Sequence, residues 1–292
     1  MLQKVSVNQA TIGMITNNIT QVAIIGTGPI GRQLTQHIAQ MGFDVILKSR
    51  SKKSLEQTMG RIKNNLSKTN MTDVNKILQK IRTTTSMSDL STTDIVIECI
   101  IEDREAKEKL FKELDDNCSP RTILATNTSS LSVNNLTKFV SNPDRLIGTH
   151  FFNPISKMHL VEIVQTKSTS DQTLHETLDF INKIEKTAII VNDSTGFIVN
   201  RLLFSMVNEA GYLLEEGNTT IQKIDTAMKL GANVPMGPFE LADYVGIDVT
   251  YKILNELNLS LNFKRPAKIF KKMIDEGKTG RKTGEGFYKY KN

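Results

Sequence analysis

The stretch QVAIIGTGPIG, residues 21 to 31, decides the fold of this chain of 292 residues. Its apolar start predicts a buried strand, and three glycines follow at the GxGxxG spacing, directly before a helix-like segment. Glycines at this spacing let a pyrophosphate approach backbone N–H groups and the positive end of the helix. A proline in the first helical turn loses no hydrogen bond. The context favours a dinucleotide-binding turn over a tight turn without a ligand, and its residues are Gly26, Gly28, Pro29, Ile30 and Gly31.

Short apolar runs alternate with amphipathic segments beyond this turn. After the first strand, the strand-like runs are residues 43–49, 94–100, 122–130 and 145–151. Strands that are separated by helices pair in parallel through right-handed crossovers, which buries both strand faces and explains why these runs are continuously apolar. Two more strand candidates extend the sheet at an edge; they are residues 159–166 and 187–193, on either side of the helix-like residues 171–186.

The pattern changes after Gly196, where no convincing strand appears before the closing GFYKY. Several of the segments there end at a glycine, as helices commonly do. We therefore expect an α/β domain with a doubly wound, mainly parallel sheet at residues 21–194 and an all-α domain at residues 195–292. The polar residues 1–20 form an extension before the fold. The helix-like segments of the second half are residues 197–217, 220–231, 239–257 and 265–277.

Composition narrows the classes of partner. With 39% apolar and 23% charged residues the chain is globular, and its net charge of +6 suits anionic ligands such as nucleotides or coenzyme A. Its basic residues are dispersed, so we expect no nucleic-acid partner. Cys99 and Cys118 form neither a disulfide framework nor a metal cluster. Without a membrane-spanning apolar run or a signal-peptide core, the chain is predicted to be cytoplasmic and free of membrane and metal.

The second strand ends without the carboxylate that usually accepts hydrogen bonds from the ribose hydroxyls of NAD. Ser49 and Arg50 stand there, and Lys52 and Lys53 follow. A hydroxyl and a guanidinium fork suit the doubly charged 2′-phosphate of NADP, and the lysines add positive field. We expect NADP as the preferred cofactor. The alternative is that the cofactor is NAD and that the basic residues of this loop contact only solvent.

Three polar residues lie where predicted strands end. Ser129 follows one strand in ATNTSSL, His150 belongs to GTHFFNP on the next, and Glu162 is isolated in the apolar LVEIV. Ligands bind at the carboxyl ends of parallel strands, so we expect the three to face one crevice. Singly they could be a turn residue, a core histidine and an edge charge. Together, a hydroxyl, an imidazole and an orienting carboxylate suit proton removal from an alcohol while hydride leaves.

Eight blocks of sequence are together more specific than any one motif: IIGTGPIG, DIVIECIIEDREAKEKLF, ILATNTSSL, LIGTHFFNP, HLVEIV, STGFIVNRLL, DTAMKLGANVPMGPFEL and GRKTGEGFYKY. In order and spacing they resemble the short-chain 3-hydroxyacyl-CoA dehydrogenase family, which includes bacterial 3-hydroxybutyryl-CoA dehydrogenases. The resemblance implies a Rossmann-type domain, then a helical domain that builds most of a homodimer. It also implies hydride transfer with NAD(P) between a 3-hydroxyacyl and a 3-oxoacyl thioester, with 3-hydroxybutyryl-CoA and acetoacetyl-CoA as the leading pair.

The same resemblance implies roles for single residues. His150 is the catalytic base and Glu162 its partner, while Ser129 and Asn200 contact the substrate oxygen near the nicotinamide. Further cofactor contacts are implied for Glu102, Lys107, Asn127, Ser129, Asn153 and Lys282. Remnants of a coenzyme A-binding segment are expected at Asn65 and Lys68.

Two departures from the family keep other hypotheses open. The helical segment at 60–84 is short and rich in Asn and Thr, where the family has a lysine-rich segment, and Arg32 replaces a small residue after the third glycine. Loss of basic residues would suit a hydroxyacyl unit on an acidic acyl carrier protein in a secondary-metabolite pathway. A second alternative is a non-catalytic dinucleotide-binding structural protein, against which the intact Ser129, His150, Glu162 and Asn200 argue.

Overall fold

The computed structural model describes residues 18–68 and 73–290, so the predicted extension lies almost entirely outside them. The chain forms two compact units. The first, here called the sheet unit, comprises the residues up to Ile101, Glu105–Asn127 and Leu136–Ile190. The second, the helical unit, comprises the residues from Val191 onward together with two short segments from earlier in the chain, Glu102–Arg104 and Thr128–Asn135.

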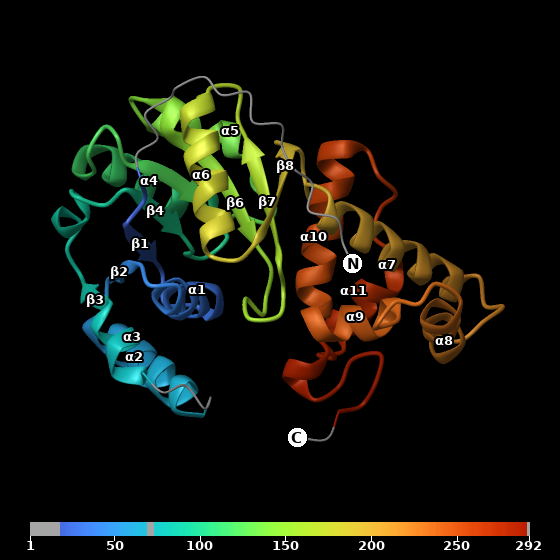
Figure 1. Cartoon of the computed structure of the whole chain (residues 1–292). Helices are drawn as coiled ribbons and strands as arrows, with labels where there is room; N and C mark the ends of the chain where they lie inside the picture. The colour runs from blue at the N-terminus through green and yellow to red at the C-terminus, as the bar shows by residue number, and fades with distance from the viewer. Residues whose placement is uncertain (1–17, 69–72, 291–292) are drawn as a thin grey trace. The chain divides into compact units, whose positions relative to one another are not determined.

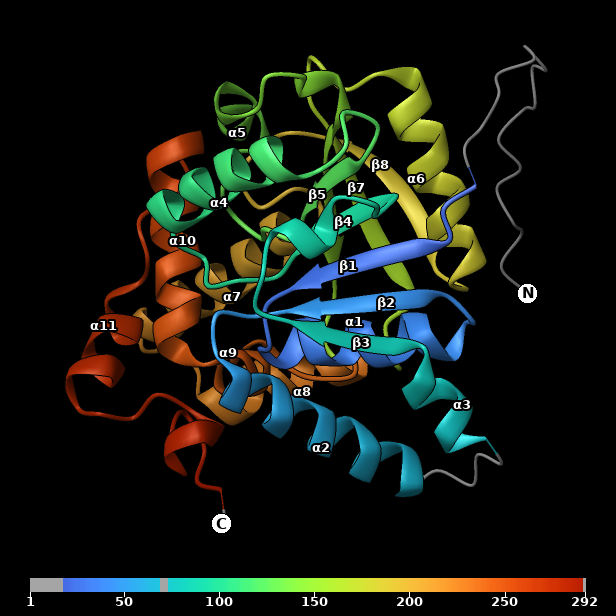
Figure 2. The same cartoon turned by 90° about the vertical axis from the view of Figure 1, so that its left-hand side faces the viewer.

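The sheet unit contains eight strands in the order β3-β2-β1-β4-β5-β6-β7-β8. From β3 to β6 all neighbours pair in parallel, whereas β7 runs antiparallel to β6. Strands β1, β2 and β3 lie side by side in Figure 2. The mainly parallel α/β sheet is therefore confirmed. The strands are β1 Gln21–Ile25, β2 Asp44–Lys48, β3 Ile81–Thr84, β4 Ile95–Glu98, β5 Ile123–Thr126, β6 Leu146–Phe151, β7 Leu160–Gln165 and β8 Thr187–Asn192.

Strand β3 lies inside the segment that the sequence predicts to be helical, so that prediction was wrong for its last four residues. Only Ile81 and Thr84 of this strand are buried. An edge strand needs little apolar surface, because only one side of its backbone pairs, here with β2. The short polar run IRTT therefore carries almost no strand signal.

Helices of the sheet unit pack against the strands and bury an apolar core. Helix α1 packs on β1 and β2, and α6 packs on β6 and β7 (Figure 1). Residues such as Leu34, Leu47 and Phe180 are essentially inaccessible in that core. The helices that accompany the sheet are α1 Pro29–Gln40, α2 Lys52–Lys68, α3 Val74–Gln79, α4 Arg104–Asn117 and α6 Asp171–Lys183, whereas the short α5 Val133–Leu136 belongs mostly to the helical unit.

The helical unit is all-α, as predicted, with its own core around Phe204, Phe239 and Phe270. Where the sequence predicts one helix at 239–257, the structure has two, separated at Gly246, whose φ of 105° a helix does not accommodate. No helix in the part of the chain that the structure describes is long and apolar enough to cross a bilayer; the cytoplasmic location stays a prediction. The unit contains α7 Val199–Glu215, α8 Ile221–Gly231, α9 Pro238–Val245, α10 Ile247–Leu261 and α11 Lys268–Asp275.

Candidate active site

The three glycines of the turn between β1 and α1 differ in the space that each leaves for a Cβ atom. A Cβ on Gly26, whose φ is 117°, would lie 2.4 Å from the carbonyl oxygen of Cys99, and one on Gly31 would lie 2.1 Å from the oxygen of Gly26. Nothing lies within 4 Å of a Cβ on Gly28, the residue directly before α1. The turn is thus tight at two glycines and open at the third, beside the N–H groups of a helix start. This geometry fits a dinucleotide pyrophosphate.

The basic loop after β2 leads directly into a second helix start. The Ser51 hydroxyl accepts a hydrogen bond from the backbone N–H of Ser54 at 3.2 Å and so caps α2. The first turn of α2 contains no acidic residue, and Arg50 is exposed just before it. The Ser54 hydroxyl also lies 2.5 Å from that of Thr27, in the glycine turn. The region beside the turn therefore combines a positive helix end with exposed cations and suits an anionic group.

His150 and Glu162 face each other across the antiparallel strands β6 and β7 as register partners. Their exposed fractions are 5% and 1%, and His150 Nδ1 lies 2.7 Å from Glu162 Oε2. An ionised carboxylate only accepts hydrogen bonds, so Nδ1 is assigned the proton and Nε2 the lone pair. The ring of Phe152 lies 4.5 Å from the imidazole, centroid to centroid. The imidazole is thus held in the tautomer and orientation that a general base requires.

Two asparagines predicted to contact the cofactor take part in the structure around His150. Asn127, directly after β5, accepts a hydrogen bond through Oδ1 from the backbone N–H of Phe151 at 2.9 Å. Asn153 accepts one through Oδ1 from the side chain of Gln33 in α1 at 2.8 Å. Both residues therefore lie in the sheet unit next to the end of β6.

Glu102 holds the loop that contains Ser129, within the helical unit. Its Oε1 accepts hydrogen bonds from the backbone N–H groups of Ser129 at 2.8 Å and Ser130 at 3.0 Å, and from the Thr128 hydroxyl at 2.5 Å. The Ser129 hydroxyl lies 3.4 Å from the same oxygen. The carboxylate thus fixes the backbone of Ser129 firmly and its hydroxyl only weakly. A hydroxyl in this position can rotate toward a ligand.

Asn200 lies in the first turn of α7 and meets the same loop. Its side-chain amide lies 3.4 Å from the carbonyl oxygen of Ser129, a long hydrogen bond. The chain reaches this position through two consecutive left-handed residues, Gly196 with φ of 75° and Phe197 with φ of 47°. For a phenylalanine such a conformation costs about 1–2 kcal/mol. The helical unit therefore brings together the two residues predicted to bind the substrate oxygen.

The two lysines predicted to contact the cofactor are engaged in ion pairs. Lys107, with an exposed fraction of 1%, places Nζ 2.6 and 2.7 Å from the two carboxylate oxygens of Glu98, which is fully buried. Lys282 pairs with Asp248 at 2.5 and 2.6 Å. Burial opposes ionisation of Asp248, but the hydrogen bond and charge of Lys282 outweigh it and lower the pKa of that carboxyl. Lys107 supports the end of β4 from inside, while Lys282 stays at the surface.

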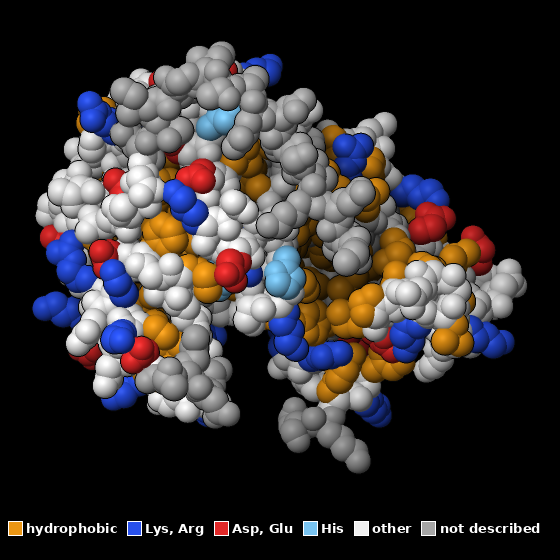
Figure 3. Space-filling model, viewed as in Figure 1, with side chains coloured by type: hydrophobic (Ala, Val, Ile, Leu, Met, Phe, Trp, Pro, Cys, Tyr) orange, Lys and Arg blue, Asp and Glu red, His pale blue; other side chains and the backbone are white. Residues whose placement is uncertain are grey.

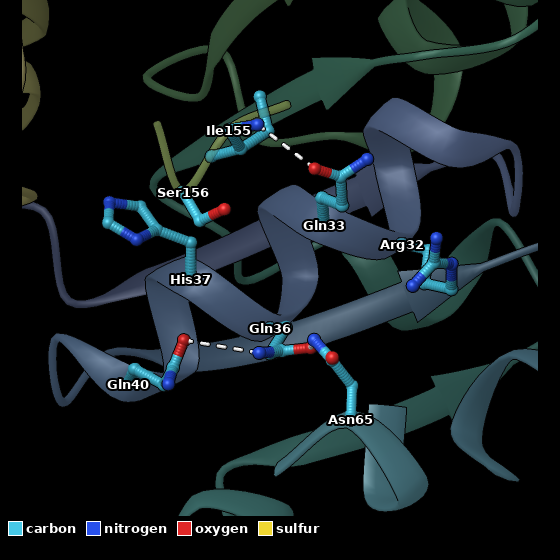
Figure 4. Close-up of a pocket in the computed structure, with 8 residues that line it drawn as sticks. All are labelled: Arg32, Gln33, Gln36, His37, Gln40, Asn65, Ile155 and Ser156. Atoms are coloured by element: carbon cyan, nitrogen blue, oxygen red, sulfur yellow. Dashed lines mark hydrogen bonds between the residues drawn. The ribbon is translucent and has the colours of Figure 1, made fainter. Parts of the chain in front are cut away.

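A polar cleft of about 270 Å³ lies along the outer face of α1 (Figure 4). The predicted coenzyme A contact Asn65 lines it from α2 and donates a hydrogen bond to Gln36 at 2.9 Å. Lys68 is exposed at the C-terminal end of the same helix. Sequence reasoning missed the cleft, although its α1 residues recur at the spacing of one helix face. They are Gln33, Gln36, His37 and Gln40, joined by Arg32, and the loop residues Ile155 and Ser156 complete the lining with Asn65.

A parallel sheet with a glycine turn after β1 and a buried histidine–carboxylate pair near the end of β6 defines the class of dinucleotide-binding proteins equipped for proton transfer. The family model for the 3-hydroxyacyl-CoA dehydrogenase NAD binding domain matches residues 21–194, and the model for the 3-hydroxyacyl-CoA dehydrogenase C-terminal domain matches residues 196–290. The chain belongs to the 3-hydroxyacyl-CoA dehydrogenase family. The resemblance inferred from its motifs is confirmed.

Individual relatives agree with this assignment. The chain is 41% identical over 288 residues to the mitochondrial hydroxyacyl-coenzyme A dehydrogenase of Sus scrofa, covering 94% of this chain and 92% of that protein. It is 38% identical to the 3-hydroxybutyryl-CoA dehydrogenase of Clostridioides difficile over 92% of this chain and 99% of the relative. The crystal structure of (S)-3-hydroxybutyryl-CoA dehydrogenase from Ralstonia eutropha superposes with a TM-score of 0.91 at 36% identity, covering 94% and 100% of the two chains.

Proposed function

We propose that this protein interconverts a 3-hydroxyacyl-CoA and a 3-oxoacyl-CoA, with 3-hydroxybutyryl-CoA and acetoacetyl-CoA as its substrate pair. The observation that carries the proposal is the buried contact of 2.7 Å between His150 and Glu162, in a unit that also contains the open glycine turn. The names of the relatives support the substrate class.

In the oxidative direction, His150 Nε2 takes the proton of the 3-hydroxyl group. A bound nicotinamide would supply the acceptor for the hydride that leaves C3. Glu162 keeps the proton of Nδ1 in place and stabilises the imidazolium that forms, because its negative charge lies 2.7 Å away in a buried site. In the reductive direction His150 returns the proton. General acid–base catalysis of this kind contributes about 10²- to 10⁴-fold to the rate.

Ser129 and Asn200 donate hydrogen bonds to the substrate oxygen as it changes between hydroxyl and carbonyl. The proposal is supported by their shared place in the helical unit, where the Asn200 amide lies 3.4 Å from the backbone of Ser129. Donors whose backbone is already in place stabilise the developing charge with little reorganisation. Gly28, with the N–H groups at the start of α1, would hold the pyrophosphate of the cofactor.

NADP is proposed as the preferred cofactor over NAD. A 2′-phosphate gains from Arg50, Lys52 and the positive end of α2, and the first turn of that helix offers no acidic residue to repel it. An unphosphorylated ribose would gain little from the same groups. Ser49→Asp combined with Arg50→Ala should therefore shift the ratio of kcat/KM values from NADPH toward NADH. A wild-type protein that already prefers NADH would contradict this proposal.

Coenzyme A is proposed to contact Asn65 and Lys68 of α2, and Arg32 adds a positive charge at the cleft. Docking of an acyl carrier protein receives no support from the comparisons, since the relatives described above are named for coenzyme A substrates. A non-catalytic role receives none either. Steady-state rates on coenzyme A-linked and carrier-linked acetoacetyl groups distinguish the two donors.

A homodimer is proposed to form through the helical unit. Figure 3 shows apolar side chains at the surface over elements of this unit. Leu202, Leu230 and Leu259 have exposed fractions of 66%, 83% and 79%. A contiguous apolar patch at a protein surface marks an interaction site. Light scattering of the purified protein gives the oligomeric state directly.

The deciding experiment is reduction of acetoacetyl-CoA by the purified protein, with NADPH and NADH side by side. We expect turnover with both and a higher kcat/KM with NADPH. His150→Gln should lower kcat by about 10²- to 10⁴-fold, because the base is lost while the cofactor turn stays intact. Near-full turnover of this variant would remove His150 from its role, and absence of turnover in the wild type would favour the non-catalytic alternative.

A further inference from the structure

The loop Thr128–Asn135 is held at both ends by carboxylates. Glu102 holds the beginning, where Ser129 lies. At the other end, Asp193 Oδ2 accepts hydrogen bonds from the Ser132 hydroxyl at 2.7 Å and from both the backbone N–H and the side-chain amide of Asn134, at 2.7 and 2.6 Å. Three donors converge on one oxygen atom. The loop therefore has a second anchor that the sequence analysis did not identify.

Asp193 comes from the connection between β8 and α7, the same connection that leads to Asn200. Its next residues form a sharp turn, in which a Cβ on Gly196 would lie 3.0 Å from the side chain of Leu257. Asn200, at the end of this connection, reaches the carbonyl oxygen of Ser129. The segment from Asp193 to Asn200 thus makes hydrogen bonds with both ends of the loop.

A carboxylate at this place holds the loop more firmly than a neutral side chain would. Hydrogen bonds to an ionised acceptor are about twice as strong as neutral ones. Asparagine at position 193 could offer its amide oxygen without the charge, and alanine would leave the donors of Ser132 and Asn134 without their acceptor. Displacement of a positioned group by about 1 Å can lower a rate by about 10²-fold.

We infer that Asp193 is a positioning residue, which fixes the loop backbone that carries Ser129, so that the Ser129 hydroxyl and the Asn200 amide donate to the same substrate oxygen. This inference rests on the proposed function. Asp193 acts through Ser129 and makes no contact with the substrate itself. Its loss should lower kcat without weakening cofactor binding, because the glycine turn belongs to the sheet unit.

The test compares Asp193→Asn and Asp193→Ala with the wild type in the reduction of acetoacetyl-CoA. We expect kcat to fall a few-fold for the asparagine variant and about 10- to 100-fold for the alanine variant, with an unchanged KM for the nicotinamide cofactor. Asp94→Asn is the matched control. Asp94 Oδ2 also accepts three hydrogen bonds, from Thr20 N at 2.7 Å, Thr20 Oγ1 at 3.0 Å and Gln21 N at 2.8 Å, at the amino-terminal end of the sheet. This control should lose thermal stability and keep its kcat.

A double-mutant cycle separates positioning from general stability. If Asp193 acts through Ser129, adding Asp193→Ala to Ser129→Ala should change kcat by less than about two-fold. Effects that multiply independently, a kcat of Asp193→Ala within two-fold of wild type, or an equal drop in Asp94→Asn would each overturn the inference. Should the alanine variant not fold, as judged by circular dichroism, the asparagine variant carries the cycle. An inactive wild type overturns the proposed function together with the inference, whereas an active wild type with an unaffected variant overturns the inference alone.

Discussion

The sheet unit and the helical unit hold their functional side chains by different means. His150 and Glu162 stand on paired strands, where the hydrogen-bond ladder sets their register and burial excludes water. Ser129 lies on a loop, which the carboxylates of Glu102 and Asp193 hold in place. The alignment of the strand pair follows from its register. The loop depends on charged anchors, each of which comes from a distant part of the chain.

The two units therefore differ in what fixes the positions of their functional atoms. Regular structure fixes the atoms that exchange a proton, for which distance and tautomer matter most. Side-chain hydrogen bonds fix the groups that bind an oxygen, and these can be adjusted one by one. We therefore expect substitutions in the strand pair to be severe and substitutions among the anchors to be graded.

The largest effect is expected for Glu162→Gln. The glutamine can accept the hydrogen bond from His150 Nδ1, but it carries no charge to stabilise the imidazolium, and its amide can turn to favour the wrong tautomer. We predict a fall in kcat of about 10²- to 10⁴-fold. Steady-state kinetics on acetoacetyl-CoA measure it, and cofactor binding by fluorescence titration should stay as in wild type. A fall smaller than that of Glu102→Gln would break the comparison between the units.

A second prediction contrasts a partly buried carboxylate of the sheet unit with a buried carboxylate of the helical unit as the pH changes. Asp115 of the sheet unit accepts hydrogen bonds from Arg145 at 2.6 Å and from the backbone of Ser141 at 2.8 Å. Burial opposes its ionisation, but these two partners outweigh burial and lower its pKa. In the helical unit, burial raises the pKa of Asp243, although it accepts hydrogen bonds from Phe287 and Tyr288.

The signs of the two contributions are opposite. A lowered folded pKa gives Asp115 a stabilising effect at neutral pH, which is lost as the pH falls through the folded value, whereas protonation of Asp243 favours the folded state as the pH falls through its raised value. Asp115→Asn should lower the free energy of unfolding by about 1 kcal/mol at pH 7, because Asp115 is only partly buried, and the difference should shrink below about pH 4. Urea unfolding at several pH values measures this. The exposed neighbour Asp116, changed to Asn, is the control, and a pH-independent difference would contradict the prediction.

The smallest effect is expected for Glu102→Gln. Glutamine keeps an oxygen for the N–H groups of Ser129 and Ser130, so the loop loses charge rather than its acceptor. We predict a fall in kcat of about ten-fold or less. Glu105→Gln, three residues further on at the start of α4, is the matched control and should behave as wild type. A loss that reached the level of Glu162→Gln would show that the loop is as critical as the strand pair.

Much of the fold could be predicted from the sequence, because long apolar runs and glycine positions report directly on buried strands and tight turns. The strand around Ile97 and the turn at Gly28 are of this kind. The strand at Ile81 could not be predicted, since its pairing along the sheet edge leaves no apolar pattern. The break at Gly246 between α9 and α10 depends on a positive φ, which a single glycine in the sequence does not predict.

The residue types of the candidate site could be listed from the sequence, but not their partners. Glu102 was expected to contact the cofactor, and the structure shows it on the backbone of Ser129, 27 residues away. Lys107 was expected there too, and it is paired with Glu98 in the interior; a cofactor contact stays a prediction for both residues. Such contacts depend on how distant segments meet in space. The spacing of charges along a chain does not contain that information.

The three turn glycines differ in how closely other atoms surround them, so selection for folding and selection for cofactor binding should act at different glycines. A side chain at Gly26 or Gly31 collides with backbone oxygen, so alanine there should reduce the amount of protein that accumulates in a cell. Alanine at Gly28 meets only open space, so the protein should accumulate normally and fail only where the cofactor needs that space. In a mutational scan, substitutions at Gly28 should therefore keep protein abundance. The same substitutions should fail in a scan that scores growth dependent on the enzyme activity. A substitution at Gly28 should therefore abolish activity and leave the amount of folded protein unchanged.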